Sequence, residues 1–117
     1  MAHAYIVDAV RTAGGRRNGR LSQVHPVDLG AVVIDALLAR TGLDPNKVED
    51  VIMGCVSQIG PQTFNLGRAT ILASRLPDSV PGVTVDRQCG SGQQAIHFAA
   101  QAVMSGNQDV VIAGGIE

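Results

Sequence analysis

The chain has 117 residues, of which 45% are hydrophobic and 16% charged, with a formal net charge of −1. This length suits one domain with a single core, and the balanced charge does not favour nucleic acid, where a basic stripe is expected. No apolar run approaches the roughly 18 residues of a membrane span, and the N-terminus lacks the features of a signal peptide. Two cysteines in such a chain do not suggest disulfides, so we expect a cytoplasmic protein.

The first part of the chain alternates apolar runs with glycine-rich turns. Residues 4–10 form a short apolar run with β-branched residues, which predicts a buried strand. Residues 11–25 are loop-like and contain a cluster of four arginines: Arg11, Arg16, Arg17 and Arg20. These arginines are expected either to be solvated or to bind a phosphate-bearing ligand or a partner chain. Pro26 suits the first turn of a helix, which Gly42 ends. Its apolar face is expected to contain Leu29, Val32, Val33, Ala36 and Leu37.

Three more strands and two more helices are predicted in the rest of the chain. Residues 48–53 predict the second strand, and Asn65 is placed to cap the second helix. Residues 83–87 predict the third strand, residues 89–104 the third helix and residues 110–113 the fourth strand. The expected apolar faces are Leu66, Ala69, Leu72, Ala73 and Leu76 on the second helix, and Ile96, Ala99, Ala100 and Val103 on the third.

The resulting order, β-α-β-α-β-α-β, predicts an α/β fold with a mainly parallel sheet covered by helices. Residues 48–53 and 110–113 are apolar enough to be covered on both faces of such a sheet. The sequence ends at Glu117, soon after a predicted buried strand. We therefore expect the chain to be a piece of a longer domain.

Residues 85–94 combine the features of a reactive site. Cys89 falls between a predicted strand and a predicted helix, and Gly90, Ser91 and Gly92 follow it. The free N–H groups and positive dipole at a helix start stabilise a thiolate, and glycines let a substrate approach the backbone. Open α/β sheets also bind ligands at the carboxyl ends of their strands. We predict Cys89 as a nucleophile; a packed cysteine in a turn and an anion-binding loop are the alternatives.

The runs VDRQCGSGQQAI and GNQDVVIAGGIE resemble the thiolase family, as do VDAVRTAGGRRNGRLS and NLGRATILASRLPDSVPGVTV. The resemblance covers essentially the whole chain. It implies an acyl-CoA:CoA acyltransferase that cleaves 3-ketoacyl-CoA or runs the reverse condensation, with CoA and acyl-CoA as substrates and no covalently bound cofactor. Cys89 matches the acyl-accepting nucleophile of the family, and its backbone N–H would contribute to an oxyanion hole.

The resemblance carries three finer expectations. Gln93 and Gln94 are more similar to thiolases acting on bulky or steroid-derived acyl chains than to the short-chain type. Residues 54–65 resemble the family's loop near the dimer interface, which implies partner contacts and a homo-oligomer, either a dimer or a tetramer. The run Thr12-Ala13-Gly14 departs from the family, which usually has proline after this threonine, so the conformation of this loop stays open.

The resemblance also implies what this sequence does not contain. The activating histidine of the family, its second catalytic cysteine and its asparagine–histidine pair all lie in later segments. We therefore expect residues 1–117 to form a thiolase-like N-terminal domain that lacks its last strand and the C-terminal half. Because those catalytic groups are missing, we expect such a chain to be inactive alone and to require the remainder of a thiolase. A free sheet edge would otherwise invite pairing, which agrees with a missing strand.

The remaining candidate residues have simpler expected roles. Cys55 is expected to be packed in the core. His3, His25 and His97 have no metal-ligand spacing with the cysteines, so no metal site is expected. His97 lies about 80° round the helix and roughly two turns from Cys89, which excludes it as the activating base, and a structural role is expected. Two other functions stay open: a non-catalytic interaction module derived from a thiolase half, and an unrelated flavodoxin-like nucleotide-binding domain.

Overall fold

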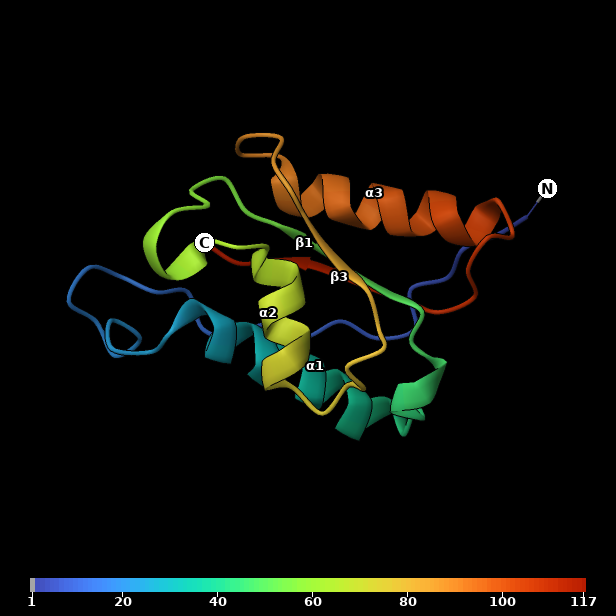
Figure 1. The fold of residues 1–117 in the computed structure, drawn as a ribbon, viewed down its shortest axis with the longest axis horizontal. Helices are drawn as coiled ribbons and strands as arrows, with labels where there is room; N and C mark the ends of the chain where they lie inside the picture. The colour runs from blue at the N-terminus through green and yellow to red at the C-terminus, as the bar shows by residue number, and fades with distance from the viewer. Residues whose placement is uncertain (1) are drawn as a thin grey trace.

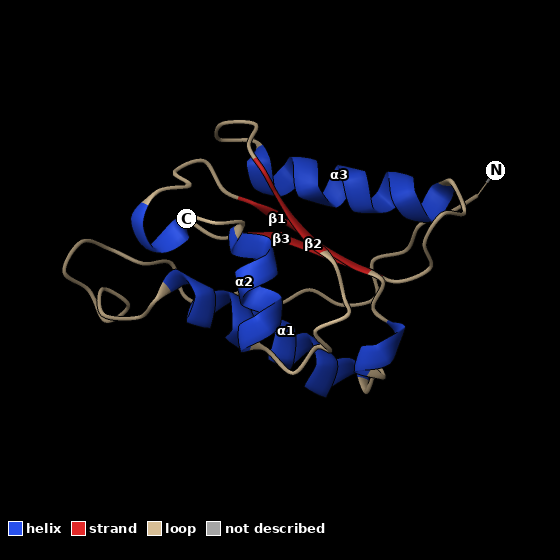
Figure 2. Ribbon diagram, viewed as in Figure 1, coloured by secondary structure: helices blue, strands red, loops and turns tan. Residues whose placement is uncertain are grey.

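The structure is a computed structural model that describes residues 2–117, so Met1 of the predicted domain lies outside it. A parallel sheet is formed by β1 (Asp50–Gly54), β2 (Gly82–Val85) and β3 (Val111–Gly115), in the order β2-β1-β3. Helices α1 (Pro26–Thr41) and α2 (Leu66–Ala73) cover one face and α3 (Ser91–Met104) the other (Figures 1 and 2). Two 3-10 turns cover Pro45–Lys47 and Gly60–Gln62. The predicted α/β class with a parallel, helix-covered sheet is confirmed.

The central strand β1 divides the core into two parts. Alternate residues of a strand point to opposite faces, so Val51 and Met53 face α1 and α2, whereas Ile52 faces α3. The larger part contains Ile34, Leu38, Val48, Val51, Met53, Ile71, Leu76, Val80 and Ile112. The smaller part consists of Ile52, Ala95 and Ala99. As predicted for this strand, β1 is covered on both faces.

The ends of α1 and α2 follow from their sequences. The His25 side chain accepts the N–H of Val27 at 3.2 Å, and Gly42 ends α1 in the left-handed region at φ +66. Asn65 caps α2 as predicted, because its side-chain oxygen accepts the N–H of Arg68 at 3.2 Å. Helix α3 begins at Ser91 rather than at Cys89, so the cysteine lies in the turn before the helix.

The predicted apolar faces of the helices are wrong in part. Helix α1 buries Gly30, Ala31, Ile34 and Leu38, whereas Val32 is 61% exposed. Helix α2 buries Leu66, Gly67, Thr70 and Ile71, and Leu72 is 54% exposed. On α3, Ala95 and Ala99 are buried but Ile96 is exposed. These helices are apolar on more than one side, and periodicity alone does not tell which side meets the sheet.

The predicted strand over residues 4–10 is also wrong. The segment pairs with none of the strands in the described part of the chain, and Tyr5, Ile6 and Val7 are at least 80% exposed. A strand needs a partner edge at about 4.8 Å, and a groove separates this segment from β3. An exposed ion pair between Asp8 and Arg40, at 2.9 Å, ties the segment to α1 and contributes at most about 1 kcal/mol.

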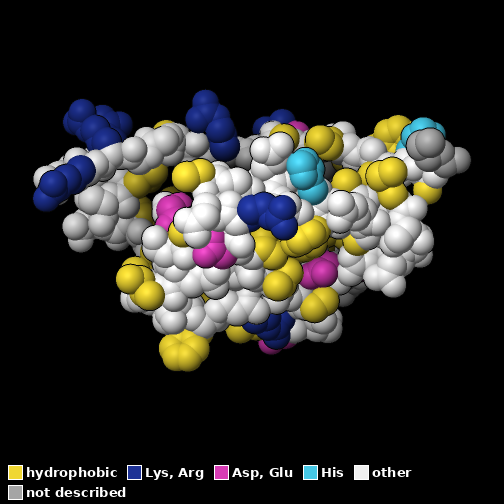
Figure 3. All heavy atoms as spheres, turned by 90° about the horizontal axis from the view of Figure 1, so that it is seen from above, with side chains coloured by type: hydrophobic (Ala, Val, Ile, Leu, Met, Phe, Trp, Pro, Cys, Tyr) yellow, Lys and Arg dark blue, Asp and Glu magenta, His cyan; other side chains and the backbone are white. Residues whose placement is uncertain are grey.

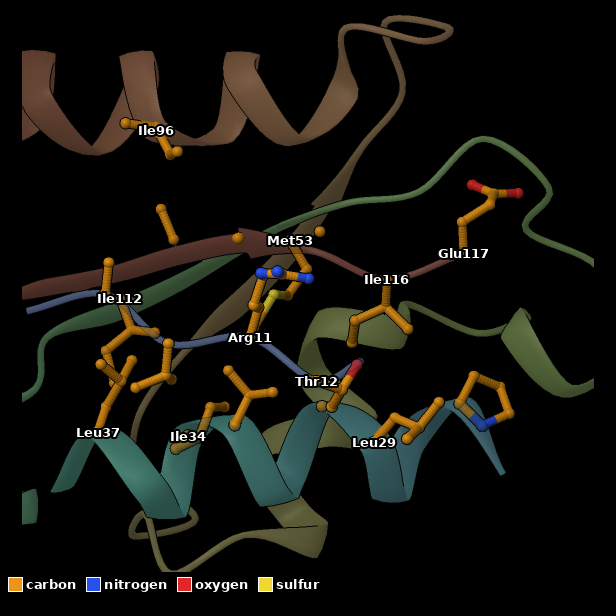
Figure 4. A pocket seen from close by; sticks show the side chains of 18 of the residues that line it. Arg11, Thr12, Leu29, Ile34, Leu37, Met53, Ile96, Ile112, Ile116 and Glu117 are labelled. Carbon is orange, nitrogen blue, oxygen red and sulfur yellow. The ribbon is translucent and has the colours of Figure 1, made fainter. Parts of the chain in front are cut away.

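The groove between the N-terminal segment and β3 has a volume of about 1420 Å³. Side chains of α1 and α3 point into it from opposite sides, as Figure 4 shows for Leu37 and Ile96. Ile112 of β3 forms part of its wall. Several of the residues predicted as apolar helix faces line this groove: Leu29, Val33, Leu37, Ile96, Ala100 and Val103. Leu37 also packs against the larger part of the core. Two apolar helix surfaces therefore converge on an open space beside β3.

Candidate active site

All three strands are parallel, so their carboxyl ends meet at one edge of the sheet. The segments that leave this edge contain Cys55 after β1, Cys89 after β2 and Glu117 after β3. Cys55 is 1% exposed, whereas the Cys89 thiol is open to solvent. The predicted separation of one packed and one accessible cysteine is therefore confirmed, and Cys89 lies where open α/β sheets bind ligands.

The turn before α3 holds Cys89 at a sharp corner. Gln88, the residue before it, adopts φ +48 in the left-handed region. This conformation costs a non-glycine residue about 1–3 kcal/mol. Hydrogen bonds within the turn oppose the strain: Asp86 accepts the N–H of Gln88 at 2.8 Å, and Arg87 accepts the N–H of Gly90 at 3.0 Å. The corner directs the chain abruptly from β2 into α3.

The first turn of α3 has no side-chain cap. Its N-cap residue is Gly90, which makes no capping hydrogen bond. Within residues 2–117, the N–H groups of Gly92 and Gln93 donate to no protein acceptor. Helix N–H groups without a partner attract negative charge and acyl oxygens. The turn therefore contains an accessible thiol and, three and four residues further on, backbone donors without a protein partner.

The end of β1 packs directly beneath this turn. A Cβ atom on Gly54 would lie 2.3 Å from the carbonyl carbon of Ser91 and 2.4 Å from the nitrogen of Gly92. Backbone atoms cannot move aside as a flexible side chain can. Glycine at position 54 is therefore required for β1 to support the first turn of α3 at this distance.

Glu117 links the end of β3 to the loop after β1. Its carboxylate accepts the N–H groups of Val56 at 2.8 Å and Ser57 at 3.1 Å. The bond from Val56 is the largest cause that lowers the pKa of Glu117. Burial, followed by the charge of Glu117, raises the pKa of the Cys55 thiol, so Cys55 is held in its thiol form. Of the two cysteines, Cys55 is therefore the packed one and Cys89 the accessible one.

Acidification is expected to release the loop from Glu117. A carboxylate with a lowered pKa stabilises the fold fully at pH values above its ordinary pKa of about 4.5, and this contribution is lost as the pH falls through the lowered pKa. The amide proton shifts of Val56 and Ser57 should therefore titrate together on the acid side, and the Glu117→Gln variant should lose that titration. NMR spectra of both proteins over a pH series measure this.

Glu49 provides the matched control for this titration. Its carboxylate accepts the N–H groups of Asp109 and Val110 away from the Cys89 turn, and these bonds lower the pKa of Glu49. Glu49→Gln should leave the Val56 and Ser57 shifts unchanged. Equal titration of those two amides in the Glu117 variant and the unmodified chain would contradict the assignment.

The histidines do not gather at the Cys89 turn. His25 caps α1, and the ring of His3 lies 6.1 Å from that of Tyr5. His97 is exposed on α3, so its expected structural role stays a prediction. Within residues 2–117 no three His, Cys, Asp or Glu side chains are grouped closely enough to hold a metal ion. No helix in this part of the chain is both long and apolar enough to cross a membrane.

The arginines that precede α1 lie on the surface, with Arg11, Arg16, Arg17 and Arg20 all exposed. Figure 3 shows Lys and Arg side chains projecting from the end of the molecule where Figure 1 draws the loop before α1. Exposure agrees with the solvated interpretation for Arg20, whereas Arg11, Arg16 and Arg17 also line the groove beside β3. It does not by itself indicate a ligand.

Three residues of the site were not predicted as functional from the sequence: Gly54, Ser91 and Glu117. The roles of Gly54 and Glu117 depend on contacts over long sequence separations, which no local pattern reports. Ser91 lies within the motif around Cys89, which is a local signal for a role at the site. Its two hydrogen bonds, however, depend on the shape of the turn, which the motif does not report.

The fold and the site together define a class of protein. This is an open α/β domain with an accessible cysteine between a strand and a helix at the carboxyl edge of a parallel sheet. Residues 4–117 match the family described as the N-terminal domain of thiolase. The chain therefore belongs to the thiolase family, and the flavodoxin-like alternative is wrong.

Curated relatives and a solved structure agree with this family. The chain is 59% identical over its full length to a steroid 3-ketoacyl-CoA thiolase of Mycobacterium tuberculosis, of which it covers 29%. It is 48% identical to a β-ketoadipyl-CoA thiolase of Acinetobacter baylyi, with 100% of this chain and 29% of that protein covered. The crystal structure of the Bacillus anthracis acetyl-CoA acetyltransferase matches with a TM-score of 0.78 and 41% identity, covering 84% of this chain and 25% of that chain. The chain thus spans 29% of the length of these relatives.

Proposed function

We propose that this chain supplies the nucleophile of a thiolase, with Cys89 accepting the acyl group of a 3-ketoacyl-CoA. The observation that carries the proposal is the accessible Cys89 thiol in a turn before α3, in a chain that matches the thiolase N-terminal domain over residues 4–117. We also propose that the protein works in the cytoplasm, because both of its cysteines are free thiols.

The proposed reaction proceeds through an acyl-cysteine. The thiolate sulfur of Cys89 bonds to the C3 carbonyl carbon of 3-ketoacyl-CoA, and the bond between C2 and C3 breaks. The electron pair passes to C2, which takes up a proton and leaves as acetyl-CoA. The thiolate of free CoA then attacks the acyl carbon, and the Cys89 sulfur departs as a thiolate. The unpaired N–H groups of the turn, together with that of Cys89, are suited to stabilise the oxyanions of these steps.

The groups that transfer protons are proposed to come from the remainder of a thiolase chain. Within residues 2–117, His25 bonds to Val27 at the start of α1, His3 lies near Tyr5, and His97 is exposed on α3, eight residues after Cys89. The groove beside β3 offers the remainder a place to pack, because it combines an unpaired strand edge with apolar surfaces of α1 and α3. Alone, this chain is expected to have no turnover.

A bulky acyl chain is the proposed substrate. Gln93 and Gln94 lie in the first turn of α3 beside Cys89, and the Mycobacterium tuberculosis relative is named for steroid substrates. The reverse condensation of two acyl-CoA molecules would use the same acyl-Cys89. The direction in the cell then depends on the concentrations of free CoA and acyl-CoA.

Reconstitution tests this function. The chain is co-expressed with the part of the Mycobacterium tuberculosis relative that follows the matched segment, and acetyl-CoA release from 3-ketoacyl-CoA and CoA is measured by mass spectrometry. We expect a complex that turns over, fastest with a steroid-derived substrate, and no turnover by either polypeptide alone. A stable complex without acyl transfer would instead favour the non-catalytic interaction module.

Residues 54–65 are proposed to contact a second subunit. Two apolar side chains of this loop are open to solvent, with Ile59 76% and Phe64 92% exposed. Phe64 also has a positive φ of 54, so the backbone holds this ring outward in a strained conformation. Exposed aromatic residues on a held loop are typical anchors of protein interfaces.

Phe64→Ser is expected to weaken homo-oligomer formation by about tenfold or more, because a buried aromatic anchor contributes strongly to an interface. Light scattering of the reconstituted enzyme at several concentrations measures the association. Leu72→Ser on α2 is the control, since Leu72 is also exposed but lies outside the loop. Equal association of the Phe64 variant and the unmodified enzyme would exclude this loop from the interface.

A further inference from the structure

We propose that Ser91 is a positioning residue for Cys89, because its hydroxyl holds the conformation of the turn, residues 87–91, that contains the Cys89 thiol. The inference rests on the proposed function, in which Cys89 accepts the acyl group. Ser91 itself is not expected to touch the substrate, since its side chain is 4% exposed and directed into the turn. It would act only through the backbone on either side of Cys89.

One hydroxyl group ties together both sides of the corner. The Ser91 Oγ accepts the backbone N–H of Arg87 at 2.8 Å and donates to the backbone carbonyl of Gln88 at 2.6 Å. Arg87 and Gln88 precede Cys89, whereas Ser91 follows it and begins α3. The hydroxyl therefore fixes the incoming chain to the first residue of the helix, with Cys89 enclosed between them.

The turn requires such a lock because its backbone is strained. Gln88 lies in the left-handed region at φ +48, which non-glycine residues rarely adopt. Strained turns persist only where the surrounding structure holds them. The backbone of Gly54 closes the space beneath Ser91, as a Cβ there would meet Ser91 at 2.3 Å. The corner is thus held by β1 below and by the Ser91 hydroxyl within.

A fixed corner holds the backbone of Cys89 in one arrangement relative to the unpaired N–H groups at the start of α3. Reaction at a carbonyl requires the nucleophile and the oxyanion donors in a fixed mutual arrangement. Without the hydroxyl, the Arg87 N–H loses its partner and the Gln88 carbonyl loses one of its two donors, so fewer bonds oppose the strain at Gln88 and the thiol is expected to sample more positions. Ser91 therefore contributes orientation rather than chemistry.

The test measures the reactivity of Cys89 in the 117-residue chain, without the remainder of the enzyme. Alkylation of Cys89 and Cys55 by iodoacetamide is followed by mass spectrometry over a pH series, with a synthetic peptide of residues 85–94 as the unpositioned reference. We expect Cys89 in the folded chain to react about tenfold faster than in the peptide at neutral pH. Ser91→Ala should lose most of this acceleration at every pH of the series.

Ser105→Ala is the matched control. Ser105 lies at the other end of α3 and bonds in the same way, donating to the carbonyl of Ala102 at 2.8 Å and accepting the N–H of Asn107 at 3.3 Å. Its removal should leave the rate at Cys89 unchanged. Cys55 reports on general loosening, because it is buried and should be alkylated faster only if the fold opens.

The outcomes separate this inference from the proposed function. If Cys89 of the unmodified chain reacts no faster than the peptide, this inference fails, and the acyl adduct on Cys89 of the reconstituted enzyme then decides the nucleophile proposal by itself. If Cys89 is accelerated but Ser91→Ala leaves the acceleration intact, the positioning role alone is wrong. If Ser91→Ala does not fold, hydrogen exchange of the unmodified chain tests instead whether the Ser91 hydroxyl holds the Arg87 amide. The Arg87 amide should then be protected, and exchange as fast as an open loop would overturn the inference.

Discussion

Replacing Cys89 with alanine is expected to abolish acyl transfer by the reconstituted enzyme, lowering kcat/KM by about 10³-fold or more. The proposed route passes through an acyl-cysteine, and no other nucleophilic side chain in the described residues combines exposure with a position before α3. The loss should appear in acetyl-CoA release. It should also appear as the absence of an acyl adduct when the enzyme is incubated with substrate and analysed by mass spectrometry.

Cys55→Ala is the control for this loss. Cys55 is 1% exposed, and burial raises the pKa of its thiol. A raised pKa leaves less of the thiolate, which is the form that reacts. The variant should keep turnover within about threefold, because packed free cysteines behave as small apolar residues. An acyl adduct found on Cys55 instead of Cys89 would contradict the assignment of the nucleophile.

Gly54→Ala is expected to lower the free energy of unfolding by about 3 kcal/mol, an effect at the upper end for one added methyl group. The new Cβ would lie 2.3 Å from the Ser91 carbonyl carbon, so either β1 or the start of α3 has to move. Urea unfolding followed by circular dichroism measures the loss. Because the displaced backbone also carries Cys89, alkylation of that thiol should slow as well.

Gly15→Ala tests whether the effect belongs to the contact rather than to glycine. A Cβ on Gly15 meets no other atom within 4 Å, so this variant should change the unfolding free energy by less than about 0.5 kcal/mol. If both substitutions destabilise the chain equally, close packing between β1 and α3 is not the cause. A stable Gly54→Ala protein would show that the contact can relax.

Much of the order of elements follows from short-range patterns. Pro26 and Gly42 bound α1, and Asn65 caps α2, because capping needs only a few neighbouring residues. The parallel arrangement of β1, β2 and β3 follows from the helices between them. The packed state of Cys55 was also predicted, since a free cysteine after an apolar strand is usually buried.

The errors have a common physical reason. Residues 4–10 have the composition of a strand, but a strand exists only where another strand offers its hydrogen-bonding edge. The helices are apolar on two sides, and the side that meets the sheet is decided by packing. The other side of α1 and α3 lines the groove beside β3. Composition describes what a segment is able to bury, not what lies next to it.

The sequence by itself determined the α/β class, the thiolase resemblance and the choice of Cys89, because these depend on local spacing and on a continuous motif. Only the tertiary structure decided how that cysteine is held. The hydroxyl of Ser91 and the support from Gly54 arise where a strained turn, a strand end and a helix start meet. Glu117 reaches Val56 across more than half the chain, and such a contact exists only after β1 and β3 have paired in register.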